Sequence, residues 1–165
     1  MKSAYIVATI NNDTLSIQNV EVYDTPMISM RNITAQSTRV LYEYRSLDLG
    51  DAFYGATNQL YDIVTLGKKY LNDNTSNNII DDDYIDDCTE NVTAYIIIYE
   101  MIHTKDIKDI KISCDLEEPN PHYGSRVKVI YDVVSYNKQN AINMAKTRLQ
   151  EIINCSPKPK DCIIF

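Results

Sequence analysis

Two histidines and four cysteines are the side chains in this sequence best suited to acid–base or nucleophilic chemistry. His103 and His122 both fall in polar stretches typical of loops. A histidine beside Cys88 or Cys114 would form the dyad of a small hydrolase or transferase, because such pairs meet in space rather than in sequence. Loop histidines without an attached motif are more often solvated. We therefore expect a protein that is not an enzyme, with the dyad as an open alternative.

The sequence lacks the fingerprints of common cofactor and metal sites. Its four glycines form no nucleotide-binding loop, and no zinc or serine-hydrolase motif is present. Asp81–Asp83 and Asp86–Asp87 offer oxygen ligands for Ca²⁺, but the glycine and closing glutamate of an EF-hand are missing. Dense like charge favours a solvated acidic segment instead. We expect no cofactor and no metal.

The last four residues, Cys162-Ile163-Ile164-Phe165, fit the pattern for prenylation of Cys162. Cys155 is a candidate second acylation site, and two anchoring signals are what stable membrane attachment requires. A prenylated peripheral membrane protein is thus one alternative. The same residues also suit a short strand at a sheet edge after Pro157 and Pro159.

The elements that must position these residues occur twice, about 90 residues apart. The run Ser3–Val7 returns as Thr93–Ile97, and Arg39–Ser46 returns as Lys128–Ser135. The apolar helix positions also repeat: Ala52, Ala56, Leu60, Ile63 and Val64 return as Ala141, Ala145, Leu149, Ile152 and Ile153. A gene duplication is the simplest interpretation.

Each copy reads as strands followed by one helix. We expect strands over 4–10, 15–23 and 39–47, a short edge strand over 27–33, and a helix that Asp48 caps and Gly67 ends. In the second copy we expect strands over 92–102, 107–115 and 126–135 and a helix capped by Asn137. Alternation in 39–47 places Val40 and Tyr42 on one face and Leu41 on the other, charged face.

The predicted fold class is α+β. A tandem β-β-(β)-β-α duplication would build antiparallel sheet or sheets with both helices packed on one side, in one domain with pseudo-two-fold symmetry over 1–165. A lone half would be marginally stable. The predicted divisions are repeat A over 3–67, an acidic linker over 68–91, repeat B over 92–155 and a tail over 156–165.

The net charge of −7 opposes general binding to a phosphate backbone. No stretch approaches the length of a transmembrane helix, and no signal peptide is evident, so we expect an intracellular, reducing compartment and free thiols. Abundant Ile, Asn, Asp, Tyr and Lys without Trp is typical of AT-rich genomes, including those of many large DNA viruses.

Tyrosines at matched strand positions raise an alternative function. Tyr5 corresponds to Tyr95 in the repeat, and Tyr42 corresponds to Tyr131. In proteins that bind single-stranded nucleic acid, bases stack on rows of aromatic rings. The two β-rich, helix-terminated halves resemble the arrangement of the Whirly and PUR families. That resemblance implies single-stranded nucleic-acid binding, although the placement of Tyr42 and Tyr131 with Val40 and Val129 favours buried rings.

Our leading interpretation is a non-enzymatic protein–protein interaction or assembly protein, in the form of a virus-encoded structural or accessory component of a virion. It would bind a protein partner or self-assemble. Because the duplicated parts are apolar scaffold, we expect the working residues in unmatched loops, and the candidates are His103, His122, Tyr123, Asp82 and Asp83.

Overall fold

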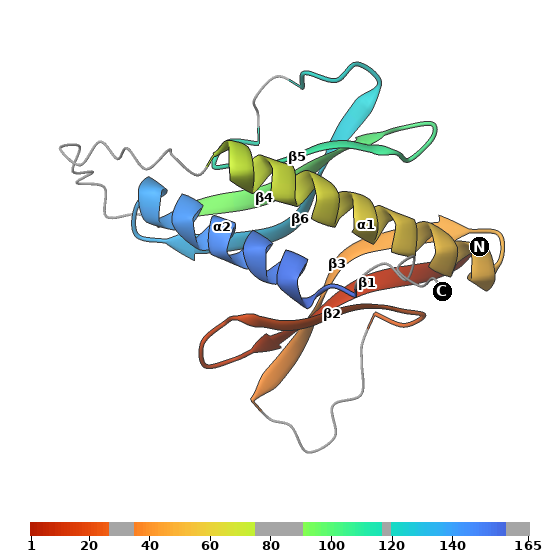
Figure 1. The fold of residues 1–165 in the computed structure, drawn as a ribbon, viewed down its shortest axis with the longest axis horizontal. Coiled ribbons are helices and arrows are strands. Elements are labelled where there is room, and N and C mark those ends of the chain that lie inside the picture. The colour runs from red at the N-terminus through yellow and green to blue at the C-terminus, as the bar shows by residue number, and fades with distance from the viewer. Residues whose placement is uncertain (27–34, 75–90, 117–119, 158–165) are drawn as a thin grey trace, which may run out of the picture. The chain divides into compact units, whose positions relative to one another are not determined.

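The structure, a computed structural model, describes residues 1–26, 35–74, 91–116 and 120–157. The first copy of the repeat comprises β1 (Lys2–Asn11), β2 (Ile17–Tyr23), β3 (Gln36–Ser46) and α1 (Leu49–Asp73). The second comprises β4 (Val92–Met101), β5 (Ile107–Ser113), β6 (Ser125–Ser135) and α2 (Lys138–Cys155), as Figure 1 shows. The predicted α+β class and the internal duplication are confirmed.

In the described residues each copy forms one antiparallel sheet of three strands, with its first strand in the centre. The strand orders are β2-β1-β3 and β5-β4-β6. These strands confirm the predicted ones to within a few residues. The edge strand predicted over 27–33 lies outside the described residues, as does most of the predicted linker.

Both sheets contain the same β-bulges. The register of β3 with β1 shifts at Leu41, and that of β6 with β4 shifts at Ile130. The register of β2 shifts at Gln18, and that of β5 at Lys108. A bulge adds one residue to one strand and re-aims the side chains that follow. Four irregularities at equivalent positions are strong evidence that one unit was duplicated.

The bulge at Leu41 corrects a prediction made from strict alternation. Leu41 was expected on the charged face, but it is buried together with Tyr42. Because Val40 lies opposite Val7 and Tyr42 opposite Ile6, Val40 and Tyr42 are on opposite faces rather than on one. The predicted burial of Tyr42 is confirmed, whereas the prediction that Val40 and Tyr42 lie on the same face of the strand is wrong.

The helix starts are as predicted. The Oδ1 atom of Asp48 accepts a hydrogen bond from the backbone N–H of Asp51 at 2.8 Å. The Oδ1 atom of Asn137 accepts the equivalent bond from Asn140 at 2.7 Å. Each side chain thereby satisfies a backbone donor that a helix N-terminus leaves without an intrahelical partner.

The end of α1 is not as predicted. The helix continues through Gly67 to Asp73, so residues 68–73 of the predicted linker are helical. A glycine inside a helix costs only about 1 kcal/mol relative to alanine. Good helix formers such as Lys68 and Leu71 follow it, and the helix ends where the Asn74 side chain donates a hydrogen bond to the carbonyl of Tyr70.

The chain separates into two compact units whose boundaries fall inside the helices. One unit lies within Met1–Val64 and Glu151–Phe165, and the other is Thr65–Gln150. In the first unit the buried apolar side chains of α1 are Ala52, Ala56, Leu60 and Ile63. Each unit therefore contains one sheet, the larger, N-terminal part of the helix that follows this sheet, and the end of the other helix.

The helix ends contact one edge strand in each unit. In the first unit, Glu151 accepts a hydrogen bond from the backbone N–H of Ile17 at 2.9 Å, and the Cys155 thiol donates one to the Ile17 carbonyl at 3.3 Å. In the second unit, the backbone N–H of Ile112 donates to the Tyr70 hydroxyl. Unpaired backbone groups of β2 and β5 thus find partners on a helix.

A close contact between Tyr44 and Gly55 gives a stability test. A Cβ atom at Gly55 would overlap the Tyr44 ring, whereas one at Gly50 would meet only Asp48 Oδ1 at 3.4 Å. We expect Gly55→Ala to lower the free energy of unfolding by about 1–3 kcal/mol despite the better helix propensity of alanine.

Urea denaturation measures this effect, with Gly50→Ala as the neutral or slightly stabilising control. The second repeat holds Val133 and Met144 at the equivalent positions. Tyr44→Val should therefore restore most of the stability lost in Gly55→Ala. Equal losses for Gly50→Ala and Gly55→Ala would show that the ring contact is not the cause.

Candidate interaction site

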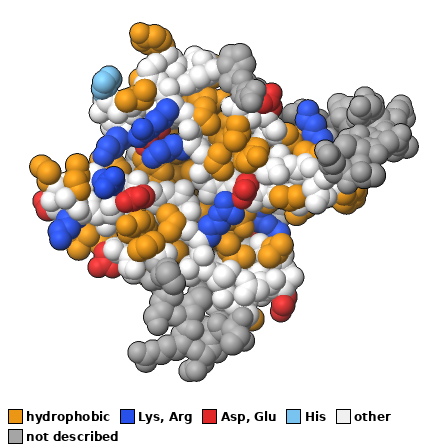
Figure 2. All heavy atoms as spheres, turned by 180° about the vertical axis from the view of Figure 1, so that it is seen from behind, with side chains coloured by type: hydrophobic (Ala, Val, Ile, Leu, Met, Phe, Trp, Pro, Cys, Tyr) orange, Lys and Arg blue, Asp and Glu red, His pale blue; other side chains and the backbone are white. Residues whose placement is uncertain are grey.

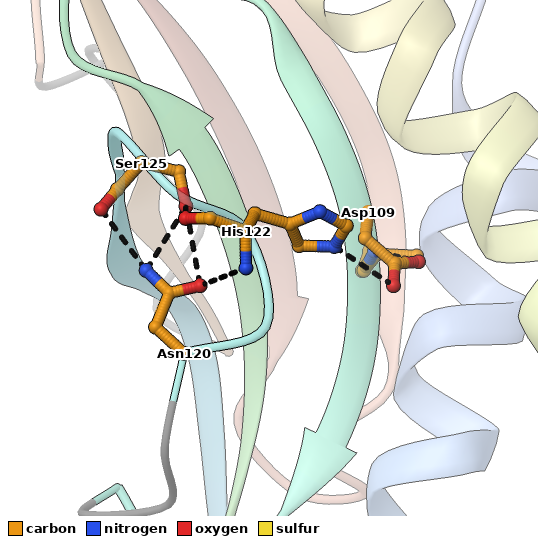
Figure 3. Close-up of polar contacts among 5 residues, drawn as sticks. Asp109, Asn120, His122 and Ser125 are labelled. Atoms are coloured by element: carbon orange, nitrogen blue, oxygen red, sulfur yellow. Dashed lines mark hydrogen bonds and ion pairs between the residues drawn. The ribbon is translucent and has the colours of Figure 1, made fainter.

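The loop Asn120–Ser125, called here the 120–125 loop, is held by its own hydrogen bonds. Asn120 Oδ1 accepts from the backbone N–H of His122 at 2.8 Å, and Asn120 Nδ2 donates to the carbonyl of Ser125 at 3.0 Å. Ser125 Oγ donates to the carbonyl of His122 at 2.7 Å (Figure 3). Gly124 has φ of +80°, a conformation that glycine adopts without strain.

The loop is also fixed to the sheet. The carbonyl of Gly124 accepts a hydrogen bond from the backbone N–H of Ile102 in the β4–β5 turn at 3.0 Å. His122 points toward β5 (Figure 3). Its ring packs on that of Tyr99, with ring centroids 5.2 Å apart. Its Nε2 atom lies 3.6 Å from Oδ2 of Asp109, the residue opposite Tyr99 on β5.

His122 is therefore an anchor of the loop and not a solvated loop histidine. Its Nε2 atom is buried and has no hydrogen-bond partner among the described residues. Protonation would turn the contact with Asp109 into an ion pair. Its neighbours are a carboxylate and an aromatic ring, and neither is the cysteine of the alternative Cys–His dyad.

The next residue, Tyr123, is the most exposed large hydrophobic residue of the described residues, with 99% of its surface accessible. Ile102, which is tied to the loop through Gly124, is 49% exposed. His103 lies beside it in the β4–β5 turn and is exposed as well. Three of the predicted interaction residues thus lie at or next to one end of the second sheet.

A buried carboxylate lies at the same end. Glu100 is 1% exposed, and its Oε1 atom lies 3.1 Å from Arg126 Nη2 and 3.4 Å from Lys128 Nζ. The equivalent residue in the first repeat is Ile10, which is buried. This ion cluster is therefore particular to the second repeat.

Sequence reasoning missed Glu100 and its partners. The signal was its period-two position in β4, after Ala94, Ile96 and Ile98, which are all buried. A glutamate in such a series requires a buried cation or hydrogen-bond donor. Which cation that is depends on strand pairing, and Arg126 lies opposite Glu100.

The other predicted residues are dispersed or lie outside the described residues. Asp82, Asp83, Cys88 and Cys162 belong to the undescribed segments. Cys114 and Cys155 are free thiols. Burial is the main cause that raises the pKa of each, and neither therefore has the thiolate character of a reactive cysteine.

Two further observations bear on the alternatives. Within the described ranges, no three His, Cys, Asp or Glu side chains come together as metal ligands would. Neither α1 nor α2, the helices of the described chain, has the length and apolarity needed to cross a bilayer. On the face shown in Figure 2, basic side chains lie close to acidic ones and among hydrophobic ones.

Comparison of the chain with models of protein families, with curated proteins and with solved structures finds no match.

The Glu100 cluster leads to a stability prediction. Arg126 and Lys128 are partly exposed, so water can solvate their charges when Glu100 is removed. Glu100 is buried, so water does not reach its carboxylate when the two cations are removed. We expect the double variant Arg126→Ala/Lys128→Ala to lose about 2–3 kcal/mol of unfolding free energy.

Addition of Glu100→Ile, which copies the first repeat, should recover most of that loss in urea denaturation. The single variant Glu100→Ile serves as the control and should be close to neutral. A triple variant as unstable as the double one would mean that packing of the two long side chains, and not a stranded carboxylate, causes the loss.

A second prediction concerns the pH dependence of Cys155. Burial first, and then the Glu151 carboxylate, raise the pKa of this thiol. A raised pKa means less thiolate at any given pH, so half-maximal alkylation by iodoacetamide should occur above the usual thiol pKa of about 8.5. The measurement uses a chain in which the other three cysteines are serine.

Glu151→Gln removes the negative charge and should move the midpoint of that alkylation profile to lower pH. Alkylation that is half-maximal at or below about pH 8.5 in the parent chain would contradict the assignment.

Proposed function

We propose that this chain is a non-enzymatic protein–protein interaction or assembly protein and that the 120–125 loop is its docking element. The observation that carries the proposal is Tyr123, which is 99% exposed at the tip of a loop fixed by Asn120, Ser125 and His122. Tyrosine is among the residues that most often dominate interface energies. The composition favours a virus-encoded component of a virion as the setting.

Pre-organisation is the physical reason why this loop suits binding. A mobile loop loses conformational entropy when it docks, and this cost weakens the complex. Hydrogen bonds within the loop, the tie to Ile102 and the packing of His122 on Tyr99 hold the loop in one conformation before any partner arrives. The loop therefore loses most of its conformational entropy when the chain folds, and little of this loss remains to weaken binding.

Single-stranded nucleic-acid binding is less well supported. Of the matched tyrosines that raised this alternative, Tyr42 and Tyr131 are buried as expected, and the Gln59 amide donates to the Tyr42 hydroxyl at 3.3 Å, whereas Tyr5 and Tyr95 are partly exposed. Bases cannot stack on the two buried rings.

Site-specific photo-cross-linking tests the proposed function. We expect benzoylphenylalanine at position 123 to give a saturable adduct with a defined protein in an extract of the native source. Excess unlabelled wild-type chain should compete for this adduct, and excess Tyr123→Ala chain should not.

The matched control is the same probe at Tyr136, which is exposed but lies outside the loop. Adduct formation at 123 no greater than at 136, or equal competition by the two unlabelled chains, would refute the loop as docking element.

A further inference from the structure

The 120–125 loop lies between two contacts with the end of β4, one on each face of this strand. Tyr99 and Glu100 are neighbours in β4, so their side chains point to opposite faces of the sheet. His122, inside the loop, packs on Tyr99. Arg126, directly after the loop, places its Nε and Nη2 atoms 3.2 and 3.1 Å from Oε1 of Glu100. The loop is thus held from both faces of one strand end.

Glu100 belongs to the last strand pairs before the loop. The residue after it, Met101, lies opposite Ser125, the last residue of the loop. The backbone N–H of Ile102 then donates to the carbonyl of Gly124 at 3.0 Å. A shift of β6 along β4 at Glu100 would therefore displace the whole loop and its exposed tip.

The alternating sequence at the start of β6 does not fix this pairing by itself. The run Arg126-Val127-Lys128-Val129 places cations on one face of the strand and valines on the other. A shift by two residues would again place a cation and a valine on the same faces. The β-bulge at Ile130 interrupts the pairing with the rest of β6, so that part constrains this stretch less than an unbroken ladder would.

Glu100 distinguishes between these registers. In the observed register both cations reach its carboxylate, Arg126 at 3.1 Å and Lys128 at 3.4 Å. A shift that put Gly124 opposite Glu100 would carry Lys128 two residues farther away. The opposite shift would carry Arg126 beyond Met101, the last residue of β4. Because a carboxylate with 1% exposure depends on these cations, both shifts are unfavourable.

The first repeat shows that the fold does not require an ion cluster at this position. Its equivalent of Glu100 is the buried Ile10, which lies opposite Ser37 in the same kind of strand pair. Apolar residues of similar volume often stabilise a buried position as well as an ion pair does, or better. The best-attested use of a buried charge is to specify one pairing among several. That use suits a strand end that leads into a fixed loop with an exposed tyrosine.

We propose that Glu100 is a positioning residue of the docking element. Through Arg126 and Lys128 it selects the register of β6 on β4, and it thereby fixes where Tyr123 is presented to a partner. This inference rests on the proposed function, because it assigns a role in presenting the same loop. Loss of Glu100 should loosen the loop while the rest of the sheet stays folded.

NMR spectroscopy of the full chain reads the register without any partner. The backbone N–H of Met101 donates to the carbonyl of Asp106, on the side of β5, so Met101 and Ser125 form a non-hydrogen-bonded pair whose α protons lie close together. The wild type should give a nuclear Overhauser effect between these two protons. In Glu100→Ile, which copies the first repeat, we expect this signal to fall at least about twofold. Hydrogen exchange of the Ile102 amide should become at least about fivefold faster.

Ile98→Val is the matched control. Ile98 is fully buried on the same face of β4, so loss of one methyl group lowers stability without removing any Glu100 contact. This variant should keep the wild-type α-proton signal and the wild-type exchange of Ile102. Benzoylphenylalanine at position 123 should give at least about fivefold less adduct in Glu100→Ile than in Ile98→Val.

Arg126→Lys provides a second reading that does not depend on the folding of Glu100→Ile. Lysine keeps the charge but cannot make the two-atom contact of the guanidinium group with Glu100. Exchange of the Ile102 amide should be at least about twofold faster than in the wild type. Wild-type exchange in this variant would count against the proposal.

Three further outcomes would overturn the proposal. The first is an unchanged α-proton signal and unchanged Ile102 exchange in folded Glu100→Ile. The second is an equal loss in Ile98→Val, which would make general destabilisation the cause. The third is an undiminished adduct from position 123 although the register signal is lost. Absence of any adduct from the wild type would refute the docking element itself and with it the positioning role; this failure is distinguishable because the register signal requires no partner.

Discussion

The hydrogen bond between the Ile17 backbone and Glu151 is the contact on which the first unit depends. It joins the second strand of the chain to its last helix, across most of the sequence. The bond from Ile112 to Tyr70 does the same for the second sheet and α1. Three strands are the fewest that are stable with one covered face, and an open edge invites pairing with other chains. Covering β2 and β5 with helix ends addresses both weaknesses, and it makes each repeat depend on the helix of the other.

On this shared scaffold the two repeats have diverged where the scaffold permits. In the first repeat the large strand residue Tyr44 packs on the small helix residue Gly55. In the second repeat the equivalent strand residue, Val133, is the smaller one and the equivalent helix residue, Met144, is the larger one. Ile10 corresponds to Glu100, which replaces an apolar contact by an ion cluster. The bulges, the helix-capping hydrogen bonds and the buried helix alanines (Ala52 with Ala141, Ala56 with Ala145) are kept. Divergence therefore reaches buried positions such as Ile10 and Glu100 as well as the surface.

Local signals explain what the sequence predicts well. Strands follow from β-branched runs, the helix starts from Asp48 and Asn137, and the duplication from direct comparison. The bulge at Leu41 could not be predicted, because an alternating pattern assumes an unbroken register. The end of α1 was misjudged because Gly67 was taken as a stop, although its neighbours favour a helix. His122 and Tyr123 were named from the sequence as loop residues. Their contrasting roles, anchor and exposed tip, depend on Tyr99 and Asp109, which only strand pairing brings to the loop.

Residue-resolved hydrogen exchange of the full chain tests most directly whether α2 completes the first unit. Glu151→Ala removes the acceptor for the Ile17 amide, whereas Glu151→Gln keeps an acceptor oxygen and serves as the control. The account predicts that Glu151→Ala speeds exchange at Ile17 and along β2, that β4 to β6 keep their protection, and that Glu151→Gln resembles the wild type. Unchanged protection of Ile17 and β2 in Glu151→Ala would contradict the dependence of the first sheet on the helix of the second repeat.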